Sequence, residues 1–311
     1  MKFYFAPLEG ISGHIYRNAY HDIFGNIDKY FAPFIVPNKS RNLKGKELKD
    51  ILPENNVDIN LVPQILTNKS EGFMDTCKKL KLLGYNEVNI NLGCPSGTVV
   101  SKFRGSGFLA KRMELDKFFY EIFKAGAENV SVKTRIGKED PEEMYELMKI
   151  YNKYPLKELI IHPRVQTDYY KGTPNLEVFK DALESSVNPV CYNGDIFTVE
   201  DYKMITEKFP QVDRVMLGRG ILRNPGIITQ IKNGKNIDKE QLKSFHDRLY
   251  NDYKRVLSGD KHVLFKMKEL WFYMGNMFQD SDKYIKKIRK SQDLVDYNII
   301  VASIFRELEL I

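Results

Sequence analysis

The sequence has few cysteines and no long apolar run, and both shortages exclude whole classes of protein. Only three of its 311 residues are cysteine (Cys77, Cys94 and Cys191), and no two of them have CxxC spacing. This pattern argues against a disulfide framework and a structural zinc site. No apolar run approaches the roughly 18 residues of a membrane span, and the opening stretch MKFYFAPLEG turns at Pro7 before a signal-peptide core could form. We expect a soluble, cytoplasmic protein with no metal site and no membrane partner.

The chain also lacks a glycine-rich nucleotide-binding turn, solenoid repeats and low-complexity segments. It contains instead eight short strand-like apolar runs, several of them separated by stretches with helical periodicity. The runs cover residues 2–6, 30–36, 61–66, 88–92, 130–135, 159–162, 189–193 and 214–218. Alternating strands and helices indicate an α/β protein with a (β/α)8 TIM barrel. An open doubly wound sheet is the weaker alternative, because the turn after the first run reads APLEGIS and is not glycine-rich.

The composition and the periodicity of the sequence change after the last strand-like run. The remaining stretch is rich in Lys, Tyr and Phe, and Leu242, Phe245 and Leu249 repeat with helical spacing. Such a segment is typical of a small helical bundle. We therefore predict a barrel domain in residues 1–236 and a separate helical domain in residues 237–311.

The charge of the chain is moderately basic. The formal net charge is +7 and the pI is about 9.0, from 48 basic and 41 acidic residues. A positive surface attracts polyanions such as nucleic acid. A merely soluble basic protein explains the same totals equally well.

One strand ends at a cysteine. Residues 88–92 read VNINL, in which apolar side chains alternate with two asparagines, and Gly93, Cys94 and Pro95 follow at once. Proline cannot donate to a strand ladder, so the strand must stop there. A buried packing cysteine is the more common reason for a single thiol at such a place. A functional thiol on a loop is the alternative. The other residues of the chain decide between the two explanations.

Polar residues follow several of the other predicted strands as well. They are Pro7 after the first, Gln64 on the third, Asn91 and Cys94 at the fourth, Lys133 and Arg135 at the fifth, His162 and Arg164 at the sixth, Asn193-Gly194-Asp195 at the seventh, and Gly218-Arg219-Gly220 at the eighth. Each has an ordinary explanation, such as a solvated charge, a core histidine or a turn glycine. Functional residues of a barrel collect at these strand ends, so the series as a whole favours a site.

The last two strand ends carry a more specific signal. Barrels commonly bind phosphate with the loops after strands seven and eight. Gly194 and Gly220 allow close approach of the backbone, and Arg219 can supply a charge. We therefore expect a phosphate-bearing cofactor, with Lys133 and His162 on the polar edge of its ring system.

An ordered set of motifs extends this pattern. The motifs are Ala6-Pro7-Leu8, Gln64, Asn91 to Pro95, Lys133 with Arg135, His162, Arg164, Tyr170, Gly172, Asn193 to Ile196, Gly218 to Gly220, and Asn224-Pro225. In the order and approximate spacing of these motifs, the chain resembles the tRNA-dihydrouridine synthases, flavin enzymes that reduce uridine in transfer RNA. The resemblance covers essentially the whole predicted barrel and extends more loosely to the helical tail. Leu8 departs from it, because the family usually has methionine there, as does Val165, where threonine is usual.

The resemblance implies bound FMN, reduced by NADPH, and a uridine in the tRNA D-loop as substrate. The residues that would hold FMN are Pro7, Leu8, Gln64, Lys133, His162, Asn193, Gly194, Asp195, Gly218 and Arg219. Those that would hold the uracil are Asn91, Arg135 and Tyr170. Cys94 would protonate carbon 5 while carbon 6 receives a hydride from the reduced flavin. No obligate protein partner is implied.

Elementary chemistry agrees with these roles. A free thiol has a pKa near ~8.5, so it is mostly protonated at neutral pH and can donate a proton. A uridine in folded RNA must leave its stack to enter a barrel mouth, which calls for a basic surface beside it. Candidates for that surface are Lys102, Arg104, Lys283, Lys286, Lys287, Arg289 and Lys290.

Two other functions compete with this interpretation. An FMN barrel enzyme that acts on a free pyrimidine, as dihydroorotate dehydrogenases do, would need no basic helical tail. A barrel that binds RNA without catalysis would have no need of Cys94 together with Lys133 and His162. The residues around Gly259 and between Lys266 and Trp271 are somewhat more similar to the branch of the family that acts on uridine 16.

Overall fold

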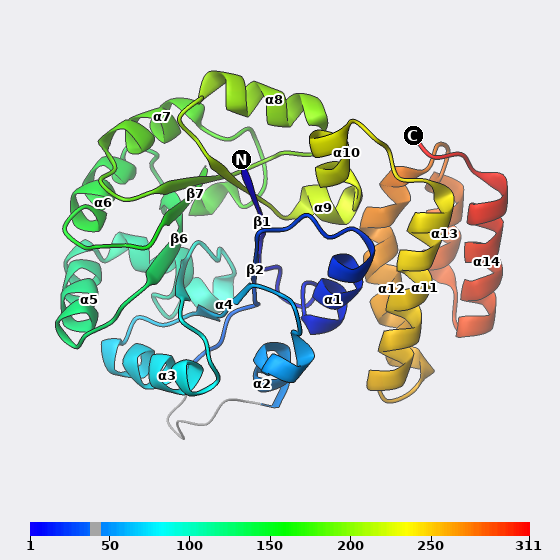
Figure 1. Ribbon diagram of the computed structural model, residues 1–311, viewed down its shortest axis with the longest axis horizontal. Helices are drawn as coiled ribbons and strands as arrows, with labels where there is room; N and C mark the ends of the chain where they lie inside the picture. The colour runs from blue at the N-terminus through cyan, green and yellow to red at the C-terminus, as the bar shows by residue number, and fades with distance from the viewer. Residues whose placement is uncertain (38–44) are drawn as a thin grey trace.

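The computed structural model describes residues 1–37 and 45–311, and in this part of the chain parallel strands form a barrel surrounded by helices (Figure 1). The strands are β1 (Lys2–Phe5), β2 (Lys29–Phe31), β3 (Leu61–Val62), β4 (Gln64–Ile65), β5 (Val88–Leu92), β6 (Val130–Gly137), β7 (Leu159–Val165), β8 (Val190–Asn193) and β9 (Arg214–Leu217). Their order in the sheet is β3-β2-β1-β9-β8-β7-β6-β5-β4. The predicted α/β barrel is confirmed.

The sheet closes because β3 and β4 are two halves of one strand. They lie at opposite ends of the strand order and are separated in the chain by Pro63 alone. Proline has no N–H to donate, so the ladder breaks there. The carbonyl of Pro63 still accepts a hydrogen bond of 2.9 Å from the Asn89 N–H. The nine strands therefore correspond to the eight predicted runs, with the third run split in two.

Helices follow the strands around the barrel and continue beyond it. They are α1 (His14–Ile23), α2 (Gly45–Ile51), α3 (Ser70–Leu82), α4 (Gly97–Val100), α5 (Arg112–Lys124), α6 (Glu143–Tyr151), α7 (Leu176–Ser185), α8 (Val199–Lys208), α9 (Arg219–Arg223), α10 (Ile227–Asn233), α11 (Lys239–Val256), α12 (Asp260–Met274), α13 (Asp282–Lys290) and α14 (Leu294–Glu307). Short 3-10 turns include η2 (Gly105–Ala110) and η3 (Gln166–Asp168).

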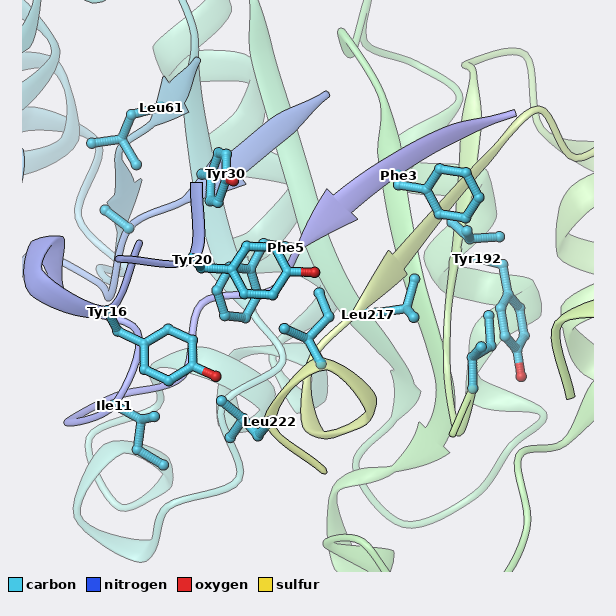
Figure 2. Packing of buried hydrophobic residues seen from close by; sticks show 14 of the residues in the cluster. Phe3, Phe5, Ile11, Tyr16, Tyr20, Tyr30, Leu61, Tyr192, Leu217 and Leu222 are labelled. Atoms are coloured by element: carbon cyan, nitrogen blue, oxygen red, sulfur yellow. The ribbon is translucent and has the colours of Figure 1, made fainter. Parts of the chain in front are cut away.

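Alternate residues of the strands face two different cores. Phe3 and Phe5 of β1 point outward, and Figure 2 shows Tyr16 and Tyr20 of α1 beside Phe5, with ring centres 5.7 and 5.6 Å away. The inward-facing cluster consists of Tyr4, Ala6, Phe31, Val62, Ile160, Cys191 and Met216. Because side chains fill the barrel interior, a ligand has room only at an end of the barrel.

Buried charges close the end of the barrel where the strands begin. Glu158 accepts hydrogen bonds from Lys29 (2.8 Å), Arg214 (3.1 Å) and the hydroxyl of Tyr4 (2.9 Å). Its side chain is only 1% exposed, so these partners supply the compensation that a buried carboxylate requires. The opposite end, where the strands finish, is the open one.

The helices after the barrel pack against α1. Phe245 of α11 lies 5.4 Å from the ring of Tyr16, 6.3 Å from Tyr20 and 5.1 Å from Phe24. Figure 1 shows α11 to α14 side by side on one flank of the barrel. Within the described ranges, no helix is long and apolar enough to cross a membrane. The domain boundary after residue 236 stays a prediction.

Candidate active site

A pocket opens at the carboxyl ends of the barrel strands. It is lined by every residue expected to hold FMN, to hold the uracil or to donate the proton, namely Pro7, Leu8, Gln64, Asn91, Cys94, Lys133, Arg135, His162, Tyr170, Asn193, Gly194, Asp195, Gly218 and Arg219. They come together because parallel strands deliver their final residues to one rim. The structure thus places these residues in one site, while the role of each depends on its own contacts.

Asn91 fixes the backbone that carries Cys94. Its side-chain Oδ1 accepts hydrogen bonds from the N–H groups of Gly93 (3.1 Å) and Cys94 (2.9 Å). Its Nδ2 donates to Oε1 of Gln64 at 2.7 Å. Asn91 is buried, so these bonds are shielded from competing water. The amide thereby holds the cysteine loop in place, a function that its strand position alone did not reveal.

A chain of buried amides anchors Gln64 in turn. Gln64 Nε2 donates to Asn89 Oδ1 at 2.7 Å, and Asn89 Nδ2 donates to the hydroxyl of Ser131 at 2.9 Å. The chain crosses β4, β5 and β6 inside the barrel. A fully bonded polar network of this kind favours one arrangement of its members. It makes the wall below Cys94 rigid.

The surroundings of Cys94 favour its protonated form. The residue is half-buried, and burial is the main cause of a raised thiol pKa. The N–H of Ser96 and the charges of Arg135 and Lys133 act in the opposite direction, since each stabilises a thiolate. A thiol with these neighbours is protonated at neutral pH and leaves a stabilised anion when it gives up its proton.

Lys133 is a cation without a partner. Among the residues that the structure describes, none forms a hydrogen bond or an ion pair with its ammonium group, which faces the pocket. Burial is the main cause that lowers the pKa of Lys133 to about 8, and the charge of Arg135 acts in the same direction. A half-buried cation without a partner is costly, so the site is suited to a ligand that brings oxygen or nitrogen acceptors.

Arg164 sets the tautomer of His162. Its Nη1 lies 3.2 Å from Nε2 of His162, and since a guanidinium only donates, Nε2 must accept. Burial and the surrounding arginines and Lys133 hold the pKa of His162 well below its usual range. The ring is therefore neutral with its proton on Nδ1. Arg164 also pairs with Asp195.

Two arginines shape the loop that presents Tyr170. Arg135 donates to the carbonyls of Gly93 (3.0 Å), Val165 (2.7 Å) and Tyr169 (2.6 Å). It is 1% exposed, so most of its donors serve the backbone. This arrangement ties the cysteine loop to the Tyr170 loop. The Tyr170 ring stays half exposed at the pocket, 5.5 Å from the Arg135 guanidinium.

Arg164 holds the other side of the same loop. It donates to the carbonyl of Lys171 at 3.0 Å and to that of Gly172 at 2.6 Å. Gly172 has a φ of +64°, a conformation that favours glycine. The loop therefore depends on buried side chains from two neighbouring strands.

The loops after β8 and β9 meet where a phosphate was predicted. Asn193 Nδ2 donates to the carbonyl of Met216 at 2.8 Å. A Cβ on Gly220 would lie 2.0 Å from the carbonyl oxygen of Ile196, so only glycine allows the two loops to touch. Arg219 pairs with Asp195 at 2.6 Å. Glycine is thus required at 220 for contact between the loops, a reason that the sequence did not indicate.

Several residues of the pocket lining were not predicted from the sequence. Phe34, Glu9 and Phe197 also line the pocket. The predicted second strand ran to residue 36, whereas β2 ends at Phe31. That error hid Phe34, although the Pro33 before it signalled the strand end. In the described ranges, no three His, Cys, Asp or Glu side chains cluster as metal ligands would.

The sequence matches a known protein family. The family model described as dihydrouridine synthase matches residues 4–308. The chain belongs to the dihydrouridine synthase family. This membership confirms the resemblance read from the motifs, and the match covers the barrel and the helices after it.

Curated relatives agree with this membership, and a solved structure shares the fold. A probable tRNA-dihydrouridine synthase of Staphylococcus aureus (strain Mu50 / ATCC 700699) is 27% identical over 265 residues, which cover 81% of this chain and 78% of that protein. The tRNA-dihydrouridine(16) synthase of Neisseria meningitidis serogroup B (strain ATCC BAA-335 / MC58) is 23% identical over 317 residues, with 97% and 94% covered. Morphinone reductase shares the fold, with a TM-score of 0.53 at 12% identity over 78% of this chain and 88% of its own.

Proposed function

We propose that this protein reduces a uridine of tRNA to 5,6-dihydrouridine, with FMN bound in the pocket and NADPH as the reductant. Family membership supports the reaction class. The observation that carries the assignment is the half-buried thiol of Cys94 in the same pocket as Lys133, whose ammonium group has no partner among the described residues. A proton donor beside a cofactor site is what the saturation of a carbon–carbon double bond requires.

The pocket suits a flavin mononucleotide. Among the residues that the structure describes, none accepts a hydrogen bond from Lys133 or from the Nδ1–H of His162, and the polar edge of an isoalloxazine ring offers acceptors. The loops at Asn193–Asp195 and Gly218–Gly220 would receive the phosphate, with Arg219 beside it. Pro7, Leu8 and Gln64 complete this side of the pocket. When bound in reduced form, the flavin supplies the hydride for carbon 6 of the uracil.

The chain's own residues handle the proton and the substrate. Cys94 gives its proton to carbon 5, and the thiolate that remains is stabilised by the Ser96 N–H and the charge of Arg135. Asn91 holds the cysteine backbone during this transfer. The exposed Tyr170 ring offers a face for the uracil. Arg135 has N–H groups left over after its backbone bonds, and these would contact the base.

The position of the reduced uridine in the tRNA is part of the same proposal. The Neisseria relative, named for position 16, aligns with nearly the whole chain, whereas the Staphylococcus relative carries no position in its name. Position 16 in the D-loop is therefore the first to examine. The cytoplasm, where tRNA is processed, is the expected location.

The experiment is reduction of tRNA by the purified protein. The protein should be yellow, oxidise NADPH and leave dihydrouridine in tRNA from a strain without its own synthases, at a position that sequencing identifies. Activity on free orotate or uracil but not on tRNA would favour an enzyme of free pyrimidines. A colourless protein that binds tRNA and oxidises no NADPH would overturn the enzyme assignment.

A further inference from the structure

Four side chains at the edge of the pocket form a row of alternating aromatic rings and guanidinium groups. In order they are Tyr170, Arg219, Phe197 and Arg223, which we call the rim row. The guanidinium of Arg219 lies 4.5 Å from the ring centre of Tyr170 and 5.4 Å from that of Phe197. The guanidinium of Arg223 lies 4.7 Å from the ring centre of Phe197. The row leads from the pocket lining out to the surface.

The two arginines of the rim row differ in their partners. Arg219 lines the pocket, is half-buried and pairs with Asp195 at 2.6 Å. Arg223, at the outer end of the row, is exposed. No residue in the described ranges offers its guanidinium a carboxylate or another hydrogen-bond acceptor. Its N–H donors are therefore available to a ligand, while the ring of Phe197 limits where the planar group can lie.

The outer end of the rim row lies between the pocket and the helices after the barrel. Arg223 ends α9, which packs against α12 (Figure 1). Burial raises the pKa of Tyr273 on α12, while the charges of Arg219 and Arg223 act in the opposite direction. The three groups are therefore close in space. A substrate that touches both the pocket and the helices passes over this point.

We propose that Arg223 binds a backbone phosphate of the RNA next to the uridine that enters the pocket. The inference rests on the proposed function, since it takes tRNA as the substrate. A guanidinium offers a fork of donors that matches two phosphate oxygens. A nucleotide drawn out of its stack keeps its flanking phosphates at the mouth of the site. Phosphate contacts of this kind set the position of the RNA and carry no sequence information.

The salt dependence of tRNA binding tests the proposal. Loss of one phosphate contact should lower the slope of log K against log salt concentration by about 0.7 to 0.9. Arg223→Ala should show that decrease and bind tRNA about tenfold more weakly at low salt. Arg223→Lys should keep the slope but bind less tightly, because an ammonium group lacks the planar fork. The control is Lys203→Ala, which removes an exposed cation on the outer helix α8 and should leave slope and affinity unchanged.

Flavin content and NADPH oxidation without tRNA are measured on the same variants. Both should equal those of the unaltered protein. A drop in flavin content in Arg223→Ala would mean that the rim row supports the pocket, and it would overturn the proposal. An unchanged slope in that variant would overturn it as well. If the unaltered protein forms dihydrouridine but Arg223→Ala has the same salt slope as the unaltered protein, the phosphate contact is wrong and the proposed function stands. If Arg223→Ala lowers the slope but the unaltered protein forms no dihydrouridine, the proposed function is wrong and the phosphate contact stands.

Discussion

At the scale of single residues, Cys94 balances two opposing influences. Burial raises its pKa and keeps the proton on sulfur. The thiolate is favoured by the Ser96 N–H, Arg135 and Lys133. These groups therefore reduce the free-energy cost of transferring the proton from sulfur to carbon 5 of the uracil. The backbone bond to Asn91 fixes where the sulfur can lie. Cys191, by contrast, lies in the interior of the barrel, where burial raises its thiol pKa well above the usual value.

Removal of the thiol should therefore affect the reduction step alone. We expect Cys94→Ala to lower the rate of dihydrouridine formation by about 10²- to 10⁴-fold, the usual contribution of a general acid. Flavin content, NADPH oxidation and tRNA affinity should stay unchanged. Cys77→Ala is the matched control, because Cys77 is also half-buried but lies on the outer helix α3. Full activity of Cys94→Ala would remove Cys94 from the acid role.

Lys133 gives a pH-dependent prediction. In the pocket without a ligand its pKa is lowered to about 8, so it loses its proton above that pH. A flavin that accepts a hydrogen bond from the ammonium group favours the protonated form, and binding then takes up a proton at higher pH. FMN affinity should be constant below about pH 8 and fall by up to about tenfold per pH unit above it.

Fluorescence titration of the flavin-free protein between about pH 7 and about pH 9.5 measures this decline. Lys133→Met should bind FMN more weakly throughout and show no decline. A decline of equal size in Lys133→Met would assign the pH dependence to another group.

The sequence predicted most residues of the pocket lining but not how they are held. Most of them lie at strand ends, which are visible in the sequence as apolar runs that stop, whereas Leu8 and Tyr170 were expected only from the resemblance to the family. The bonds of Arg135 to the carbonyls of Val165 and Tyr169 depend on the path of a loop. That path includes Tyr169 at a φ of +52°, which no local pattern in the sequence announces.

At the scale of elements, strand positions were predicted well because apolar runs define them. The split of the third strand at Pro63 was missed, although the proline was visible. Serine is a common N-cap residue, yet Ser70 does not cap α3. Lys69 occupies the cap position, and the Ser70 hydroxyl instead donates to Glu121 at 2.5 Å. A partner 51 residues away lies beyond any local pattern.

The contact between the loops after β8 and β9 can be tested at Gly220. A methyl group there would lie 2.0 Å from the Ile196 carbonyl, so one loop must move. We expect Gly220→Ala to lower the free energy of unfolding by about 1 to 3 kcal/mol, as overpacking does. The flavin content should fall, because the same loops form the predicted phosphate site. Gly97→Ala is the control, since a Cβ there meets nothing within 4 Å.

Urea unfolding and the flavin absorbance of the purified variants measure both effects. Gly220→Ala with unchanged stability and full flavin content would mean that the loops are free to separate. Contact between the loops would then not require glycine at this position.

At the scale of the whole molecule, the helices after the barrel share a core with it. One contiguous cluster of buried apolar residues includes Phe5 of β1, Tyr16 of α1, Phe245 of α11 and Ile304 of α14. The sequence predicted a separate helical bundle because strand-like runs stop, and periodicity alone gives no information about what a helix packs against. The shared aromatic contacts predict that the chain unfolds as one unit.

A calorimetric scan of the full chain tests this cooperativity. We expect one transition, with a calorimetric enthalpy close to the van't Hoff enthalpy. Phe245→Ala should shift that transition as a whole and cost about 3 to 5 kcal/mol, because the ring is fully buried against Tyr16 and Phe24. Phe265→Ala should change stability by no more than about 0.5 kcal/mol, since that side chain is 74% exposed. Two separate transitions, with only the second sensitive to Phe245→Ala, would instead mean that the helices fold independently of the barrel. Their position beside the pocket would then depend on the tRNA rather than on the fold.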